Sequence, residues 1–553
     1  MKRRDLLYTL AGWPATGALA QAGAADSTAG GDLDDPYADV DWGNCAYLHS
    51  MSHQHQGQTD SSRDVFYQMG YRHFAFSNYY PSAPTYPLPE AYLAKRPEVI
   101  GAPNAEQHSF PDAGLHFNSL GSLLATGYGS SLSAKQCAAA PLIHRFEDLH
   151  VFDCAQPWRG VYRLDISLAV AETVAAGNGP PAALLTIAGA NECAFRENFA
   201  DRGPIRDRPL APGSHTIYLR TTAPNLETTL TYDNARLSVS QFRLMQGANR
   251  PWREMFRAAL DGELVDGRRT GGLLHAAGGG ITLNHPTGKL DDYATMLDFD
   301  PRVLGIEIWN QLTSGFGSNK GFYDHGPGPH LYFYRLWDDL LRTGRRCWGF
   351  FVKDHNTFGR GRNVLLVPDS ADRPSAEREA AALRAYRTGT FFGSVAALAA
   401  NDTGEVVPPY DQSDFRFSSI AVRRDANGKP TAIKAAVIGN DPEKRPNVQL
   451  RFITDRGVER VADAPQAEFS LKSDDTGRLV PLFVRVEAFA YPRTHLRGEP
   501  LTAEKLRKMN VFDISRLHDR KALRSAASSR SSPELRTPIP IVDMIFSQPL
   551  RRV

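Results

Sequence analysis

The chain has 553 residues, of which 42% are hydrophobic and 22% are charged, a composition typical of globular proteins and not of disordered or fibrous ones. This length predicts about three domains of roughly 150 residues each. Lysine and arginine total 63 and aspartate and glutamate total 61; the first 22 residues carry a net charge of +2, so the remainder is formally neutral. A neutral body has no broad basic surface, and we expect neither nucleic acid nor anionic lipid as a partner.

The amino terminus has the features of an export signal. Residues 1–22 combine a basic start, a modest apolar stretch and a small-residue tail ending in Ala-Gln-Ala, which is a plausible cleavage site. The arginine pair near the start resembles the twin-arginine type of signal. No later segment has 18 consecutive apolar residues, so the sequence predicts no membrane span. We therefore expect a periplasmic or secreted protein.

Helical and strand-like segments alternate in two separate blocks. In the first block, residues 61–71 have helical spacing and residues 72–81 form a short strand-like run. In the second block, an amphipathic helix at 251–267 precedes the strands "GGGITLNHP" and "PRVLGIEIWN", and a helix within 330–346 precedes the strand "CWGFFVKDHN". This alternation is typical of a parallel sheet or a (β/α) barrel.

Two further regions are rich in strands. From about 130 to 248, turn-punctuated runs such as "GVYRLDISLAV" and "SHTIYLRTT" show little helical spacing, which predicts an inserted β-sandwich. Runs such as "VQLRFITDRG", within about 392 to 492, predict a terminal antiparallel sandwich.

Histidines and carboxylates follow several of these strand-like runs. In "YLHSMSHQHQ" (47–56), His53 and His55 point to the same side if the chain is extended, and can share a metal ion; an alternative register uses His49 in place of His55. The carboxyl ends of parallel strands meet at one edge of a sheet, so residues remote in sequence can share a pocket. The other candidates are Glu106, His116, His285 and the adjacent Asp354 and His355. Such a set suits divalent zinc, manganese or iron, with two or three ions per chain.

The order HxH, Glu, His, His-Pro and a final Asp-His pair resembles the PHP family of metal-dependent phosphoesterases, named for polymerase and histidinol phosphatase. The resemblance covers about residues 42–122 and 250–368. It implies an α/β fold with a distorted seven-stranded (β/α)7 barrel, up to three metal ions, and hydrolysis of phosphate mono- or diesters. It implies metal-ligand roles for His53, His55, Glu106, His116, His285, Asp354 and His355.

The expected organisation combines this barrel with the two sandwiches. In chain order it comprises the export signal (1–22), the first part of the barrel (42–125), the inserted β-sandwich (130–248), the second part of the barrel (250–390), the C-terminal β-sandwich (392–495) and a C-terminal extension (496–553).

Two motifs depart from the family pattern. The family usually has Asp-His after its second strand, where this chain has Ser77-Asn78-Tyr79, so one metal site is expected to be missing or rebuilt. The final motif is commonly Asp-x-His, whereas Asp354 and His355 are adjacent, so that one of them points away unless the strand end is kinked or bulged.

No side chain is expected to act as the nucleophile. A metal-activated water is the expected attacking group, and a ligand or a nearby histidine is the expected proton shuttle to the leaving group. The catalytic residues predicted on this basis are His116, Asp354 and His355. Glu307, at the end of another strand, is expected either to bind a metal or to orient a ligating imidazole.

Two alternatives stay open. The Trp, Tyr and Arg content of the insertion resembles that of sandwiches that hold carbohydrate, which favours a metal-dependent enzyme acting on a carbohydrate-linked substrate. The neutral pair Asn78-Tyr79 favours a non-catalytic protein that binds a glycan or another partner on a degenerate barrel. The expected partner is thus a small-molecule or glycan-linked ester, and the oligomeric state stays open.

Overall fold

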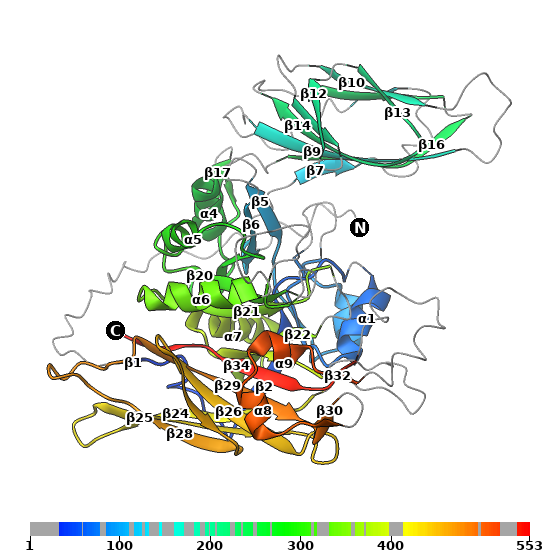
Figure 1. Cartoon of the computed structure of the whole chain (residues 1–553). Helices are drawn as coiled ribbons and strands as arrows, with labels where there is room; N and C mark the ends of the chain where they lie inside the picture. Colours follow the sequence, from blue (N-terminus) through cyan, green and yellow to red (C-terminus); the bar gives the residue numbers. More distant parts are fainter. Residues whose placement is uncertain are drawn as a thin grey trace.

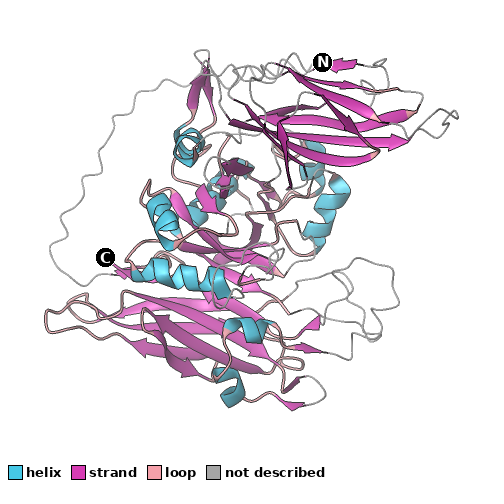
Figure 2. Ribbon diagram, turned by 45° about the horizontal axis from the view of Figure 1, so that its top comes forward, coloured by secondary structure: helices cyan, strands magenta, loops and turns pink. Residues whose placement is uncertain are grey.

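The computed structural model describes residues 33–57, 59–77, 85–109, 115–123, 128–131, 143–145, 160–170, 182–188, 194–197, 200–204, 207–221, 227–233, 236–246, 251–265, 268–310, 315–317, 331–355, 360–369, 372–397, 413–495, 499–519 and 539–553. Within these ranges the chain is built mainly from β-sheets, with few helices (Figure 2). The export-signal prediction and the pair Asn78-Tyr79 lie outside the described residues.

The largest sheet joins strands from both ends of the chain. Eleven strands of the described part belong to it, in the order β1-β35-β29-β34-β23-β22-β2-β3-β4, with β26 pairing to β29 and β27 to β26. Their bounds are β1 (Leu33–Asp34), β2 (Cys45–Met51), β3 (His73–Phe74), β4 (Ile100–Gly101), β22 (Gly361–Pro368), β23 (Phe391–Val395), β26 (Asn447–Thr454), β27 (Gly457–Ala462), β29 (Phe483–Tyr491), β34 (Asp543–Ser547) and β35 (Leu550–Arg552). Strands β2, β3 and β4 pair in parallel, but β2 pairs with β22 in antiparallel fashion.

A second sheet has five strands, in the order β21-β20-β19-β6-β5. Strands β19, β20 and β21 are parallel, whereas β5, β6 and β19 pair antiparallel. The bounds are β5 (Glu106–Ser109), β6 (Leu115–Leu120), β19 (Gly280–Leu283), β20 (Val303–Asn310) and β21 (Trp348–Val352).

The two sheets meet just beyond the ends of β2 and β21. Gln54 forms an isolated parallel bridge with Asp354. The backbone N–H of His55 donates to the carbonyl of Asp354 at 3.3 Å, and the N–H of Asp354 donates to the carbonyl of His53 at 3.1 Å. The segments that carry His53, His55 and Asp354 therefore meet at this junction.

The described strands between residues 128 and 246 form two antiparallel sheets that stack as two layers, apart from the large sheet (Figure 1). One has the order β13-β10-β15-β8 and the other β12-β11-β14-β9-β16-β7. The bounds are β7 (Tyr128–Ser131), β8 (Ile143–Arg145), β9 (Gly160–Val170), β10 (Ala183–Ala188), β11 (Ala194–Glu197), β12 (Ala200–Pro204), β13 (Asp207–Leu210), β14 (Gly213–Thr221), β15 (Glu227–Thr231) and β16 (Leu237–Gln246).

The C-terminal region adds a three-stranded sheet, β24-β25-β28, near the large one (Figure 1). Its strands are β24 (Arg416–Arg424), β25 (Pro430–Ile438) and β28 (Gln466–Ser470). Phe417, Ile433 and Val437 from this sheet pack in one cluster with Val486 and Ile545 of the large sheet. Short strand pairs complete the described part: β17 (Glu263–Val265) with β18 (Arg268–Thr270), β30 (Thr494–His495) with β31 (Glu499–Pro500), and β32 (His518–Asp519) with β33 (Ile539–Pro540).

Helices cover the sheets with their apolar sides. Helix α1 (Asp60–Gln68) begins with a capping box at Thr59 and buries Phe66. Helix α6 (Tyr332–Arg342) buries Trp337, and α7 (Ser375–Thr388) ends at Gly389, whose left-handed φ of 76° suits glycine. The others are α2 (Glu90–Lys95), α4 (Trp252–Asp261), α5 (Leu290–Leu297), α8 (Ala503–Arg507) and α9 (Val511–Ser515). In the described part of the chain, no helix has the length and apolar character needed to cross a membrane.

The predicted α/β fold with a (β/α)7 barrel is wrong. In the described residues the parallel pairs between named strands are those of β2-β3-β4 and β19-β20-β21, and antiparallel strands border both groups. The alternation of helix and strand in the sequence does not determine the direction in which the next strand pairs, and β6 and β22 return antiparallel. The C-terminal strands then extend the sheet of β2. The result is a β-rich protein of several sheets.

Candidate metal centre

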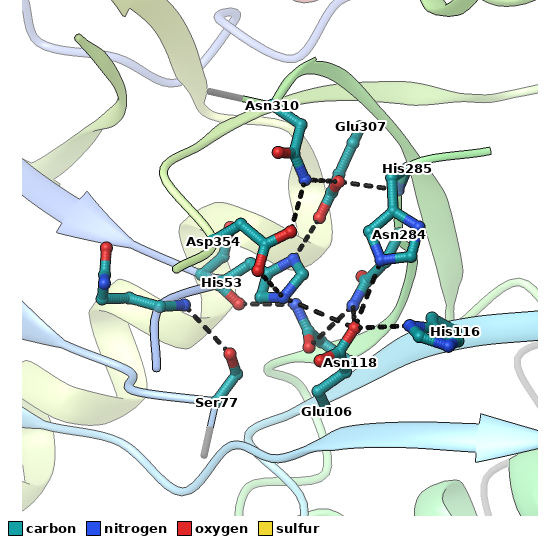
Figure 3. Close-up of polar contacts among 12 residues, drawn as sticks. His53, Ser77, Glu106, His116, Asn118, Asn284, His285, Glu307, Asn310 and Asp354 are labelled. Atoms are coloured by element: carbon teal, nitrogen blue, oxygen red, sulfur yellow. Dashed lines mark hydrogen bonds and ion pairs between the residues drawn. The ribbon is translucent and has the colours of Figure 1, made fainter. Parts of the chain in front are cut away.

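Six of the seven predicted ligands lie together in two groups that can each hold a metal ion. The groups are His53, His55 and Asp354, and Glu106, His116 and His285. Figure 3 shows five of these side chains, those of His53, Asp354, Glu106, His116 and His285, pointing toward a common centre.

The spacing of the first group fits one divalent ion. Nε2 of His53 lies 3.1 Å from Nε2 of His55, and Oδ1 of Asp354 lies 3.5 Å from each of these nitrogens. Ligand atoms bound to one ion at about 2.1 Å lie roughly 3.0–3.4 Å from one another, so the three atoms need only small shifts. All three residues are buried.

Glu106 connects the first group to the second. Its Oε2 lies 2.9 Å from Nε2 of His55, in the first group. Its Oε1 lies 3.0 Å from Nδ1 of His116 and 3.4 Å from Nε2 of His285, in the second group. Oε1 also lies 3.5 Å from Nε2 of His53, in the first group. A carboxylate that contacts both ligand sets is suited to bridge two ions about 3.5–4 Å apart.

Local backbone geometry places two of these residues. The non-glycine residues with positive φ in the described part are His285, at 22°, and Asp354, at 56°, and both belong to the centre. This conformation is unfavourable for residues with a side chain, and such residues are concentrated at functional sites. Gly57, two residues after His55, has a φ of 86°, and a Cβ there would lie 2.3 Å from the Phe76 ring, so this position requires glycine.

The turn at Asp354 separates it from His355. The Asp354 side chain is buried in the centre, whereas 48% of the His355 side chain is exposed. The His355 ring stacks on His55 at a centroid distance of 4.0 Å, and its Nε2 lies 3.6 Å from Oδ1 of Asp354. His116 is 26% exposed. The structure thus places His355 beside the centre rather than among its grouped ligands, and the two partly exposed histidines mark its accessible side.

Glu307 contacts both groups. Its Oε1 lies 2.6 Å from Nδ1 of His53, on the opposite side of the ring from the ligand nitrogen. Its Oε2 accepts hydrogen bonds from the backbone N–H of His285 at 2.7 Å and from Nδ2 of Asn310 at 2.8 Å. Asn310 Nδ2 also donates to Oδ2 of Asp354 at 3.1 Å. A carboxylate behind a ligating imidazole fixes the ring and its tautomer.

Sequence reasoning missed Asn310, Asn284 and Asn118. Glu307 and Asn310 are three residues apart, and a regular strand would direct them to opposite faces. The register of β20 against β21 shifts between Glu307 and Trp309, and this irregularity brings both side chains to the same centre. Of the three, only Asn284 could have been proposed as a site residue from its neighbours in the sequence, because it directly precedes His285.

The carboxylates favour positive charge at the imidazoles. Burial alone would lower the pKa of His53, but Asp354, Glu106 and Glu307 outweigh it and raise that pKa well above its ordinary value. The pKa of His285 is raised in the same way, against the effect of burial. For the half-exposed His355, burial and the neighbouring His55 lower the pKa to about 4. A site that attracts positive charge is the electrostatic setting that a divalent cation needs.

Ser77, the first residue of the departure from the expected motif, has a structural role. Ser77 Oγ accepts a hydrogen bond from the Gln54 N–H at 2.9 Å, and the Ser77 carbonyl accepts one from the Glu106 N–H at 2.8 Å. Ser77 therefore ties the HxH turn to the segment that carries Glu106. His49 lies in β2 beside Tyr71 and belongs to neither ligand group.

No family model matches the chain, and no curated protein matches it. Three solved structures are similar to it at 10% identity: the β-glucosidase DesR from Streptomyces venezuelae in complex with D-glucose (80% of this chain and 56% of that chain, TM-score 0.12), vicilin from Corylus avellana (62% and 76%, TM-score 0.10), and a cycloisomaltooligosaccharide glucanotransferase from Paenibacillus sp. complexed with cycloisomaltoheptaose (80% and 44%, TM-score 0.10). The match thus spans about half of the glucosidase. TM-scores this low carry no argument about fold or function.

Proposed function

We propose that the protein is a metal-dependent hydrolase that cleaves phosphoesters with an activated water, as its resemblance to the PHP phosphoesterases implies. The observation that best supports this function is the Glu106 carboxylate, which contacts histidines of both ligand groups. A pair of divalent ions lowers the pKa of a water and offsets negative charge that develops on a phosphoryl oxygen.

The charges of the centre support an anionic substrate. Glu106 and Asp354 are ligands, and Glu307 contacts His53 from behind. Two dications outweigh these three carboxylates by one positive charge. A buried centre with a net positive charge favours a phosphoester over a neutral ester, because the attraction between opposite charges is strong where water is excluded.

The accessible histidines are placed to move protons. His116 and His355 are the partly exposed imidazoles of the centre, and each contacts a ligand carboxylate. His116 can hold the proton that the leaving oxygen needs, whereas His355, whose pKa is lowered to about 4, is neutral near pH 7 and can only receive a proton. His53 and Asp354 are buried and act as ligands.

A metal-dependent assay tests the proposal. The protein, freed of metal and reloaded with Mn²⁺ or Zn²⁺, should hydrolyse bis-p-nitrophenyl phosphate or p-nitrophenyl phosphate. His53→Ala should lower the rate at least about 100-fold, because it removes a buried ligand. His275→Ala is the matched control: His275 lies beside Glu379 and belongs to neither ligand group.

Absence of metal-dependent hydrolysis of both phosphoesters would overturn the proposal. Activity on an oligosaccharide panel alone would favour a carbohydrate-linked substrate instead. Equal rates for His53→Ala and His275→Ala would show that hydrolysis does not use this centre.

A further inference from the structure

Asn284 contacts the Glu106 carboxylate from inside the centre (Figure 3). It follows β19 directly, precedes His285, and is 2% exposed. Its Nδ2 donates to Oε1 of Glu106 at 3.2 Å and to Oδ1 of Asn118 at 3.1 Å. The amide nitrogen therefore holds the carboxylate oxygen that faces His116 and His285.

The orientation of the Asn284 amide is fixed by its neighbours. Asn118 Nδ2 donates to the carbonyl of Ser52 at 2.8 Å, so its Oδ1 must face Asn284. Glu106 Oε1 is also an acceptor, and a reversed Asn284 amide would place oxygen against two acceptors. The Asn284 oxygen therefore points away from both.

The side-chain oxygen of Asn284 has no hydrogen-bond partner among the described residues, although it is buried. A buried amide oxygen without a partner costs roughly 1–3 kcal/mol, so such groups usually mark a place where a water or ligand binds. The oxygen of an amide lies about 2.2 Å from its nitrogen. A donor bound to it therefore lies within a few ångströms of the amide that holds Glu106 Oε1, on the opposite side of that amide.

We propose that Asn284 is a further catalytic residue, whose side-chain oxygen accepts a hydrogen bond from the attacking water while its nitrogen holds Glu106. This inference rests on the proposed hydrolase function. Water is the fitting occupant because it can donate to Asn284 and still present a lone pair to the substrate. The hydrogen bond would orient that lone pair toward the ester.

Two substitutions separate the two roles of Asn284. Asn284→Ala removes both the donor and the acceptor. Asn284→Asp keeps acceptor oxygens but loses the donor and adds a charge beside Glu106. Asn104→Ala is the matched control: Asn104 is 1% exposed, and its side-chain oxygen likewise has no partner among the described residues. Its nitrogen donates to the carbonyls of Ser52 and Ala75 at 2.7 and 2.8 Å, not to a ligand side chain.

Kinetics at saturating Mn²⁺ test the acceptor role. We expect Asn284→Ala to bind as many ions as the wild type, with kcat lowered at least about tenfold and KM changed less than about threefold. Asn284→Asp should bind Mn²⁺ at least as tightly as the wild type, because it adds a negative charge beside the ions, and should keep a higher kcat than Asn284→Ala. Asn104→Ala should lose thermal stability but keep kcat.

Electron spin-echo spectroscopy of the Mn²⁺-loaded proteins in D₂O tests the same role without turnover. The deuterium signal from water near Mn²⁺ should change in Asn284→Ala and stay unchanged in Asn104→Ala. An unchanged signal in Asn284→Ala, or equal kcat values for the Ala and Asp variants at saturating Mn²⁺, would overturn the inference. If the wild type hydrolyses no ester, the proposed function fails, and the spin-echo comparison still decides whether Asn284 holds a water.

Discussion

Glu307 contacts both ligand groups through separate oxygens. Oε1 lies against His53 Nδ1, and Oε2 accepts from the backbone of His285 and from Asn310. Because the two ligand groups come from different strands, this carboxylate holds their relative position. Removing its charge should therefore lower the affinity of both ligand groups for metal ions.

Glu307→Gln tests this coupling. The glutamine keeps the size of the side chain but loses the charge that stabilises the Nδ1–H of His53, and metal affinity should fall about 10- to 100-fold. Calorimetric titration of the metal-free protein with Mn²⁺ measures the change. Glu379→Gln, a buried carboxylate away from the two ligand groups, should bind Mn²⁺ like the wild type. An affinity for Glu307→Gln within about twofold of the wild type would contradict the coupling.

Residue type and position at a strand end suffice to propose most of the ligands. His53 and His55 are recognisable by their spacing, and His285 and Asp354 by their place after apolar runs. The sequence does not show which member of the Asp354-His355 pair turns inward, because that depends on a backbone φ of 56°. For the same reason the partnership of Asn310 with Glu307, which needs a strand irregularity, is not visible in the spacing.

At the scale of elements, a buried ion pair anchors α6 to the large sheet. Arg485, on β29, donates through Nη2 to Oδ1 of Asp338 at 2.8 Å, and it also pairs with Glu487. The guanidinium is 1% exposed and lies over the rings of Tyr334 and Trp337. This ion pair therefore holds α6, the helix that follows β20 in the chain, against β29 of the large sheet.

Asp338→Ala should destabilise the protein by about 3 kcal/mol, because it leaves a buried guanidinium with incomplete pairing. Urea unfolding followed by circular dichroism measures the free energy of unfolding. Asp339→Ala, on the same helix, is the matched control: Asp339 is 49% exposed and pairs with Arg342, so its loss should cost less than about 0.5 kcal/mol. Equal losses in the two variants would contradict the anchoring role.

Glu379 on α7 makes stability depend on pH. Burial raises the pKa of Glu379 to about 7, against an opposing hydrogen bond from Tyr86. The neighbouring His275, whose Nε2 lies 3.5 Å away, has a pKa lowered by burial. The folded protein thus keeps a proton that the unfolded chain releases near pH 4.5, and stability should fall as the pH rises from about 4.5 to about 7.

Glu379→Gln removes this titration and keeps an amide that can contact Tyr86. Relative to the wild type, the variant should gain unfolding free energy between pH 5 and pH 8, as measured by urea unfolding across that range. A difference between the two proteins that does not change with pH would contradict the raised pKa.

At the scale of the whole molecule, the large sheet combines strands from positions 33 to 552 of the chain. The helix and strand periodicities of the sequence identify many local elements, but they do not determine the order of the strands in the sheets. The pairing of β23 with β34 and of β34 with β29 depends on tertiary contacts between segments about 150 and 55 residues apart, which no local pattern encodes. The barrel prediction failed for this reason, while the ligand-bearing strand ends still converge.

The metal content of the purified protein, measured by mass spectrometry after equilibration with Mn²⁺ or Zn²⁺ and removal of free metal, tests the central claim most directly. A centre bridged by Glu106 should hold two ions per chain, and His285→Ala should hold one, while His275→Ala should hold two. Fewer than one ion per chain in the wild type, or the same content in His285→Ala as in the wild type, would contradict a two-ion centre at this site.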